Sequence, residues 1–210
     1  MFNKSKLKEI NLKNLIEISK ILKNFEYSIY FGTLLGITRD KEIIGGDDDI
    51  DILVNIENKD KIENIIKKTK KFKINKKKSN AYFVQFVNNR NKVKSFIDFY
   101  FFVSLRKQKF IIEKHNFSGL VNDNRFAFHI PKKLMFPLKK SRIIKDLKIP
   151  RNSIGMCKYL YGEKWKKPLQ KNSEYRWEII NNKPLLIKRS YLGSLNRKIK
   201  NFLTNKFKKQ

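Results

Sequence analysis

Four aspartates fall within five positions of residues 45–54, GGDDDIDILV, in a chain whose formal net charge is +30. The apolar residues after them predict a strand, in which side chains alternate between two faces. If the strand is regular that far, Asp47, Asp49 and Asp51 share one face and repel one another unless a cation lies between them. Mg²⁺ or Mn²⁺ would accept such ligands and keep positions open for substrate phosphates. The alternative is an acidic turn after two glycines.

Asp98 is the only charged residue of a second apolar segment, residues 95–103, SFIDFYFFV. Its aromatic and β-branched neighbours predict a strand that is buried on both faces. A lone carboxylate there is costly unless it is paired or bound to a metal. We assign Asp98 as a third metal ligand, with a buried salt bridge to Arg or Lys as the alternative.

A third feature is residues 31–39, FGTLLGITR, where Gly32 and Thr33 stand at a predicted strand-to-helix junction. Unpaired N–H groups and the helix dipole favour a phosphate at such a junction. Arg39, further along the helix, adds a permanently charged bidentate phosphate donor. Together with the two acidic segments, this feature favours a metal-dependent phosphate chemistry over the structural alternatives.

The hydrophobic periodicity predicts an α+β or α/β domain on a mixed β-sheet with flanking helices. Helices are expected over residues 7–22, 33–39, 58–72 and 153–162, and strands over 26–32, 49–54, 81–87, 95–103, 109–113 and 125–130. We assign residues 1–170 to a catalytic domain and residues 171–210 to a basic, helical C-terminal extension. An apolar stripe flanked by lysines, from Leu192 to Phe207, predicts a helix that lies on an anionic membrane or packs on its own core.

The single cysteine, Cys157, points to a reducing compartment, and no apolar run approaches a signal peptide or a spanning helix. We therefore expect a cytoplasmic protein, soluble or peripheral at the inner face of the membrane. Part of the basic excess reflects a Lys-, Asn- and Ile-rich composition typical of an AT-rich genome. The remaining charge attracts polyanions such as nucleic acid, anionic lipid or phosphate-bearing substrates.

These motifs resemble the LicD/fukutin-type phosphotransferases of the nucleotidyltransferase superfamily. The similarity covers about residues 25–168, with GTLLG at 32–36, DDDID at 47–51, FIDFYFF at 96–102 and the ending IPRNSIGMCKYLYGEKWKKP at 149–168. Gly45 and Gly46 replace the Pro-Trp pair that the family commonly has before the acidic run, and the cysteine-rich zinc element of animal members is absent. The resemblance implies a nucleotidyltransferase-like fold.

The resemblance also implies an activity: transfer of a phosphorylated alcohol, such as phosphocholine or ribitol phosphate, from a CDP-linked donor to a glycan hydroxyl at the cell surface. It assigns Asp49 and Asp51 as metal ligands, and Asp98 as a further ligand or the group that accepts the acceptor's proton. Asp47 is an outer ligand. It assigns three residues to binding of the donor phosphate: Gly32 and Thr33 at the start of the helix, and Arg39 further along it.

Two other functions use the same residues. A nucleotidyltransferase acting on RNA or on a small molecule would use the same glycine and Asp-x-Asp elements. In a non-catalytic, basic nucleic-acid-binding protein, the acidic strand would have a structural role only. The net charge of +30 is the main argument for an RNA ligand, and the motifs give it less support.

Overall fold

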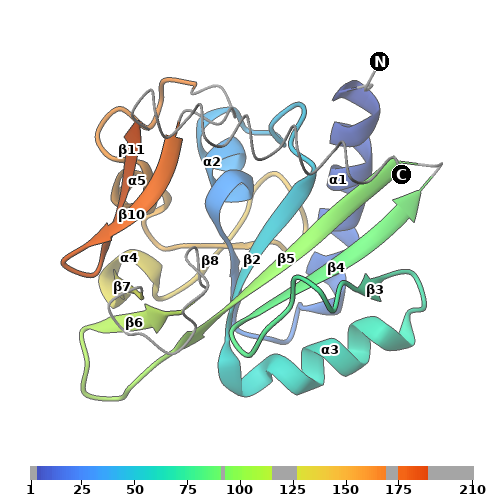
Figure 1. Cartoon of the computed structure of the whole chain (residues 1–210), viewed down its shortest axis with the longest axis horizontal. Helices are drawn as coiled ribbons and strands as arrows, with labels where there is room; N and C mark the ends of the chain where they lie inside the picture. The colour runs from blue at the N-terminus through green and yellow to red at the C-terminus, as the bar shows by residue number, and fades with distance from the viewer. Residues whose placement is uncertain (1–3, 91–92, 115–126, 169–174, 189–210) are drawn as a thin grey trace, which may run out of the picture.

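The computed structural model describes residues 4–90, 93–114, 127–168 and 175–188. They form an α+β fold on a mixed, curled sheet whose main strand order is β1-β2-β5-β4-β3 (Figure 1). These strands are β1 (Tyr27–Ile29), β2 (Asp49–Asn55), β3 (Lys73–Ile74), β4 (Phe83–Arg90) and β5 (Val93–Val103). The α+β class predicted from the sequence is confirmed.

The central pair of the sheet, β2 and β5, is parallel, and its register places Asp51 opposite Asp98. The neighbours of this pair, β1 and β4, are antiparallel to it. Apolar residues of both strands, such as Ile52 and Phe99, are fully buried, as expected of parallel strands covered on both faces. The acidic residues therefore lie where two buried strands run side by side.

Helix α1 (Lys4–Ile21) covers one face of the sheet and contacts β2 and β5. Its apolar stripe, which includes Leu7, Leu15 and Ile18, is completely buried. The other helical elements are α2 (Phe31–Arg39), η1 (Ile56–Asn58), α3 (Lys59–Lys68), α4 (Lys132–Met135) and α5 (Ser153–Tyr161). Helix α5 packs against α2 and so supports the helix that starts beside the acidic strand.

Further strands extend the sheet from the end of β5. Strands β6 (Phe110–Glu113) and β7 (Phe128–Pro131) are added there in antiparallel pairs. A separate small hairpin joins β8 (Lys139–Lys140) to β9 (Lys148–Ile149). The sequence did not predict β3, β8 or β9, because strands of two residues carry too little pattern. Within the described residues, no helix has the length and apolar character needed to cross a bilayer.

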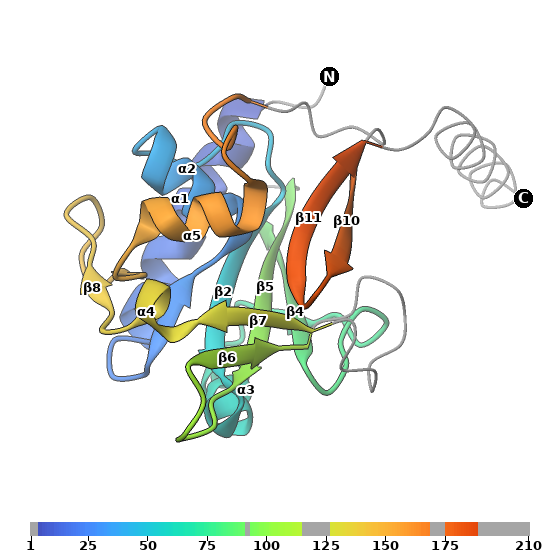
Figure 2. The ribbon, with the colours of Figure 1, turned by 90° about the vertical axis from the view of Figure 1, so that its left-hand side faces the viewer.

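The C-terminal extension contains a β-hairpin, β10 (Tyr175–Ile180) and β11 (Lys183–Lys188), where the sequence predicted helix. The reason is the turn: Asn181 and Asn182 both have positive φ, 50° and 59°, as a two-residue hairpin turn requires. Figure 2 shows this hairpin beside α5 and β7, on the opposite side of the sheet from α1. The helix predicted over residues 192–207 lies outside the described residues.

Candidate active site

Three carboxylates from two strands meet at the centre of the fold. Oxygens of Asp49, Asp51 and Asp98 all lie within 4.8 Å of one another. Asp51 is 4% exposed and Asp98 6%, whereas Asp49 is half-buried. Parallel pairing of β2 with β5 produces this convergence, because it aligns Asp51 and Asp98 on neighbouring strands. The site is therefore an all-oxygen cluster that concentrates negative charge.

Asp51 is held by hydrogen bonds from two directions. The Thr33 N–H donates to Asp51 Oδ2 at 3.3 Å, and the Asp51 N–H donates to Thr33 Oγ1 at 2.8 Å. On the other side, the Tyr100 hydroxyl donates to Asp51 Oδ1 at 3.2 Å. Burial raises the pKa of Asp51 well above its ordinary value, and the neighbouring aspartates raise this pKa further. The cluster thus holds carboxylates in a setting that penalises their charge.

The start of α2 lies against the cluster at Gly32. A Cβ atom at this position would lie 2.6 Å from Asp47 Oδ2 and 3.4 Å from Asp51 Oδ2. The preceding residue, Phe31, has a φ of 29°, a conformation that bulky residues rarely adopt. Its ring packs against Tyr100 at 5.1 Å between centroids, which holds the sharp entry into the helix. A side chain at this position fits only if the Asp47 carboxylate turns aside.

Asp47 precedes β2 and belongs to a second carboxylate group with Asp48 and Asp49. The Asn11 side chain of α1 donates to the main-chain oxygens of Asp47, at 2.9 Å, and Asp49, at 3.4 Å. Asn11 is fully buried, so this amide fixes the main-chain path of the acidic segment from the side of α1. Asp47 therefore lies at the edge of the cluster, beside the helix start.

This arrangement of a glycine-threonine helix start and aspartates on two adjacent strands accompanies a sequence match. A family model described as LicD/FKTN/FKRP, nucleotidyltransferase domain, matches residues 24–152, more than half of the chain. The chain belongs to this family. The resemblance inferred from the motifs is confirmed, and membership suggests a transferase with a phosphotransferase-type role in glycan modification. No curated protein matches the chain.

Arg39 lies apart from the other predicted residues of this LicD-family site. It is seven residues after Gly32, which is about 10 Å along the axis of α2. Its guanidinium forms two hydrogen bonds with Asp40, Nε to Oδ1 at 2.8 Å and Nη2 to Oδ2 at 2.7 Å. This pairing holds the pKa of Asp40 below its ordinary value. In the structure, the guanidinium is thus engaged with a carboxylate at the far end of the helix.

Thr33, predicted to bind donor phosphate, makes two hydrogen bonds within the protein. Its N–H and its hydroxyl both bond to Asp51, so the residue anchors a carboxylate. The structure brings together Gly32, Thr33 and the carboxylates of Asp47, Asp49, Asp51 and Asp98, and places Arg39 elsewhere.

The sequence reasoning missed three residues that hold the LicD-family site: Asn11, Gln85 and Tyr100. Gln85 interrupts the apolar run AYFVQFV much as Asp98 interrupts its own strand, so the same reasoning applied to both would have found it. Asn11 lies on the apolar stripe of α1, which is a comparable signal. Tyr100 offers none, because a tyrosine in an aromatic strand is usually core.

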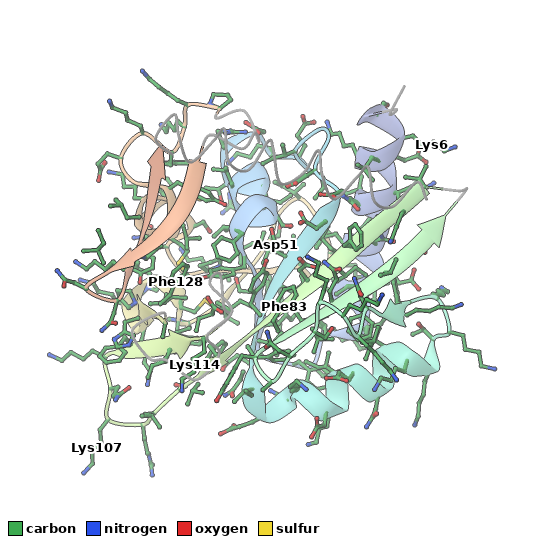
Figure 3. All side chains as sticks on the ribbon, in the orientation of Figure 1. Lys6, Asp51, Phe83, Lys107, Lys114 and Phe128 are labelled. Carbon is green, nitrogen blue, oxygen red and sulfur yellow. The ribbon has the colours of Figure 1, made fainter. Side chains whose placement is uncertain are left out.

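Aromatic side chains form the wall beside the carboxylates. In Figure 3, Asp51 lies near the centre of the view, with Phe83 and Phe128 around it. Ring centroids of Phe83 and Tyr100 are 5.1 Å apart, and those of Phe31 and Phe128 are 6.2 Å apart. An apolar wall lowers the local dielectric, which strengthens any electrostatic interaction at the cluster.

The residues present fit a hard divalent cation. Ligands of one Mg²⁺ ion, each at about 2.0–2.1 Å, lie at most about 4.2 Å apart. The three carboxylates already have oxygens within 4.8 Å of one another, so small side-chain rotations would bring them to that spacing. Mg²⁺ and Mn²⁺ prefer oxygen ligands of this kind. Asp49, Asp51 and Asp98 are the residues that could hold such an ion, with Asp47 at the edge.

Proposed function

We propose that the protein is a metal-dependent transferase that moves a phosphorylated alcohol, such as phosphocholine or ribitol phosphate, from a CDP-linked donor to a glycan hydroxyl. CMP is the other product. The observation that carries the proposal is the convergence of Asp49, Asp51 and Asp98 beside the start of α2 in a LicD-family domain. The setting proposed is the cytoplasmic face of a membrane, in the modification of cell-surface polysaccharide.

In this reaction the acceptor oxygen forms a bond to the phosphorus that carries the alcohol, and the bond from that phosphorus to the CMP oxygen breaks. The acceptor hydroxyl releases its proton, and Asp98 is the proposed recipient or a further metal ligand. Asp49 and Asp51 would hold Mg²⁺ or Mn²⁺, which when bound neutralises charge on the donor's phosphates. Gly32, Thr33 and Arg39 are the proposed donor-phosphate residues, and Thr33 and Tyr100 keep Asp51 in place.

A thermal-shift screen tests the donor class. CDP-linked alcohols with Mg²⁺ are expected to raise the melting temperature by about 5 to 10 °C at about 100 times Kd. ADP-, GDP- and UDP-linked compounds, and CDP compounds without a divalent ion, should give little shift. The Asp49→Asn variant is the matched control and should lose the response. Equal shifts with all nucleotides would contradict a CDP-specific donor site.

A second candidate, a nucleotidyltransferase acting on RNA or a non-catalytic nucleic-acid-binding protein, is favoured by the net charge of +30. Salt-dependent RNA binding that persists when Asp49 and Asp51 are neutralised, without nucleotide turnover, would support the non-catalytic version. Transfer of a nucleotide to RNA that is lost in the same variants would support the enzyme.

Membrane association through the basic C-terminal extension is a further part of the proposal. Full-length protein is expected to float with anionic liposomes at low salt, and a chain cut after Lys188 should stay at the bottom of the gradient. The cut belongs after Lys188 because β11 ends there, so the hairpin stays intact. Flotation of the shortened chain at full strength would remove the extension from membrane binding.

A further inference from the structure

Gln85 lies directly opposite Asp98 across the antiparallel pair of β4 and β5. Its side-chain Nε2 donates to Asp98 Oδ1 at 2.9 Å. The bond occupies one oxygen of a carboxylate that is 6% exposed and that belongs to the acidic cluster. The bond therefore fixes the direction in which the Asp98 carboxylate points within the cluster.

The Gln85 side chain is itself oriented by Asn75, in the turn after β3. Asn75 Nδ2 donates to Gln85 Oε1 at 2.7 Å. The ionised carboxylate of Asp98 can only accept, so it takes the Gln85 nitrogen; the Asn75 nitrogen then donates to the Gln85 oxygen and holds the amide in that orientation. The opposite orientation of the Gln85 amide would place two acceptors against each other at Asp98 and two donors against each other at Asn75.

The backbone of the same turn holds both amides in register. The Asn75 N–H donates to the Gln85 carbonyl oxygen at 2.8 Å, and the Gln85 N–H donates to Ser79 Oγ at 3.1 Å. The Asn75 carbonyl accepts from the N–H groups of Lys78, at 3.0 Å, and Ser79, at 3.1 Å. Hydrogen bonds thus hold both the side-chain amide and the main-chain groups of Gln85, and they fix the arrangement of the Asn75–Gln85–Asp98 hydrogen-bond network.

A neutral donor suits a metal ligand better than a cationic one would. The residue that lies opposite Asp98 on β4 is an amide, Gln85. A lysine there would add a positive charge that competes with a divalent ion, whereas a glutamine orients the carboxylate without adding charge.

We propose that Gln85 is a positioning residue that orients Asp98 for divalent-cation binding, and that Asn75 sets the orientation of Gln85. This inference rests on the proposed metal dependence and adds two residues to it. Neither residue is expected to contact the cation or the substrate. Outer-shell partners of this kind typically contribute about 10- to 100-fold to metal affinity.

The test is the affinity of the full-length protein for Mn²⁺ without substrate, by calorimetry, with unfolding in urea measured alongside. Gln85→Leu removes the donor and is expected to weaken Mn²⁺ binding by about 10- to 100-fold. Asn75→Asp replaces the donor with an acceptor that attracts the Gln85 nitrogen, and should weaken binding by about 10-fold. Asn80→Asp is its matched control, because it makes the same charge change in the same turn and keeps the acceptor that Asn80 Oδ1 offers the Tyr82 N–H at 2.8 Å.

The outcomes separate this inference from the proposed function. Wild-type protein that fails to bind Mn²⁺ would overturn both. An Asp98→Asn variant that binds Mn²⁺ as tightly as wild type would overturn this inference alone, because the proposed function would keep Asp98 as the proton recipient. If Asp98→Asn weakens binding while Gln85→Leu and Asn75→Asp do not, the metal site stands and the positioning role of Gln85 is wrong. Equal weakening in Asn75→Asp and Asn80→Asp would also overturn it, because the effect would follow charge and not orientation.

Discussion

Asp51→Asn is expected to lower turnover by about 10³-fold and, at neutral pH, to make the metal-free protein more stable. Loss of a ligand that fixes a divalent ion removes several kcal/mol of transition-state stabilisation, and about 4 kcal/mol corresponds to that change in rate. The fold should be kept, because asparagine still accepts from the Thr33 N–H and its amide group can donate to the Tyr100 hydroxyl oxygen. Steady-state transfer assays with the donor identified by the screen measure the first effect.

The gain in stability follows from the charge of the cluster. Burial, together with Asp49, Asp47 and Asp98, raises the pKa of Asp51, so the ionised carboxylate weakens the folded state whenever no cation is bound. A neutral amide removes that penalty. The melting temperature in EDTA should rise by about 2 to 4 °C for each kcal/mol of repulsion removed. Asp60→Asn, an exposed carboxylate in the first turn of α3, is the charge-matched control and should give no rise.

The pH dependence gives the sign of the effect. The pKa of Asp51 in the folded protein lies above its ordinary value of 3.8, so between these two pKa values the folded state binds more protons than the unfolded state. The contribution of Asp51 is therefore fully favourable below pH 3.8 and is lost as the pH rises through the folded pKa. The advantage of Asp51→Asn should shrink as the pH is lowered. A variant that is less stable than wild type at neutral pH in EDTA would contradict the electrostatic account.

The parts of the fold that could be predicted are those with a long hydrophobic period. Helix α1 and strand β5 carry such patterns over 18 and 11 residues, and both form near the predicted bounds. The parallel pairing of β2 with β5 could not be derived, because it joins segments that are more than forty residues apart, at Asp51 and Asp98. The local hydrophobic pattern predicts each strand, whereas the strand that lies next to it depends on the packing of the whole sheet.

The hairpin β10–β11 has a recognisable signal in the sequence, although a helix is predicted for this extension. An Asn-Asn pair at 181–182 between two β-prone runs is a signal for a two-residue turn. The excess of lysines after Glu178 drew attention to helical amphipathicity instead. The charge pattern extends over the whole segment, whereas the structure of residues 175–188 is determined by the Asn181–Asn182 turn within it.

Within the site, the acidic residues were predictable from the sequence. Of the residues that support them, Gln85 and Asn11 carry a signal as polar residues at apolar positions, and Tyr100 carries none. A carboxylate in an apolar strand is conspicuous whatever surrounds it, which singles out Asp98. The partners Tyr100 and Asn11 touch Asp51 and the acidic segment only through tertiary contacts. The role of Arg39 as a phosphate donor stays a prediction, and the structure adds that its guanidinium pairs with the adjacent Asp40, a contact that the spacing from Gly32 does not reveal.

The glycines of the GTLLG segment are expected to separate function from stability. In Gly36→Ala, the added Cβ would lie 2.6 Å from the Glu42 carbonyl oxygen and 3.2 Å from the Ile44 nitrogen, which are main-chain atoms that cannot rotate away. Overpacking of this kind costs about 1 to 3 kcal/mol, so the melting temperature should fall by about 2 to 4 °C for each kcal/mol. The Mn²⁺ affinity of the folded fraction should stay close to that of wild type.

Gly32→Ala is expected to show the reverse. Its Cβ would lie 2.6 Å from Asp47 Oδ2, the end of a side chain that can turn aside, and alanine favours a helix by about 1 kcal/mol over glycine. Stability should therefore hold, while the displaced carboxylate and the filled space at the helix start lower turnover by about 10- to 100-fold. Gly45→Ala is the control, since a Cβ there meets nothing within 4 Å. Urea unfolding and transfer assays on the three variants check the contrast, and a Gly32→Ala protein with wild-type turnover would mean that nothing in the reaction needs the open approach to α2.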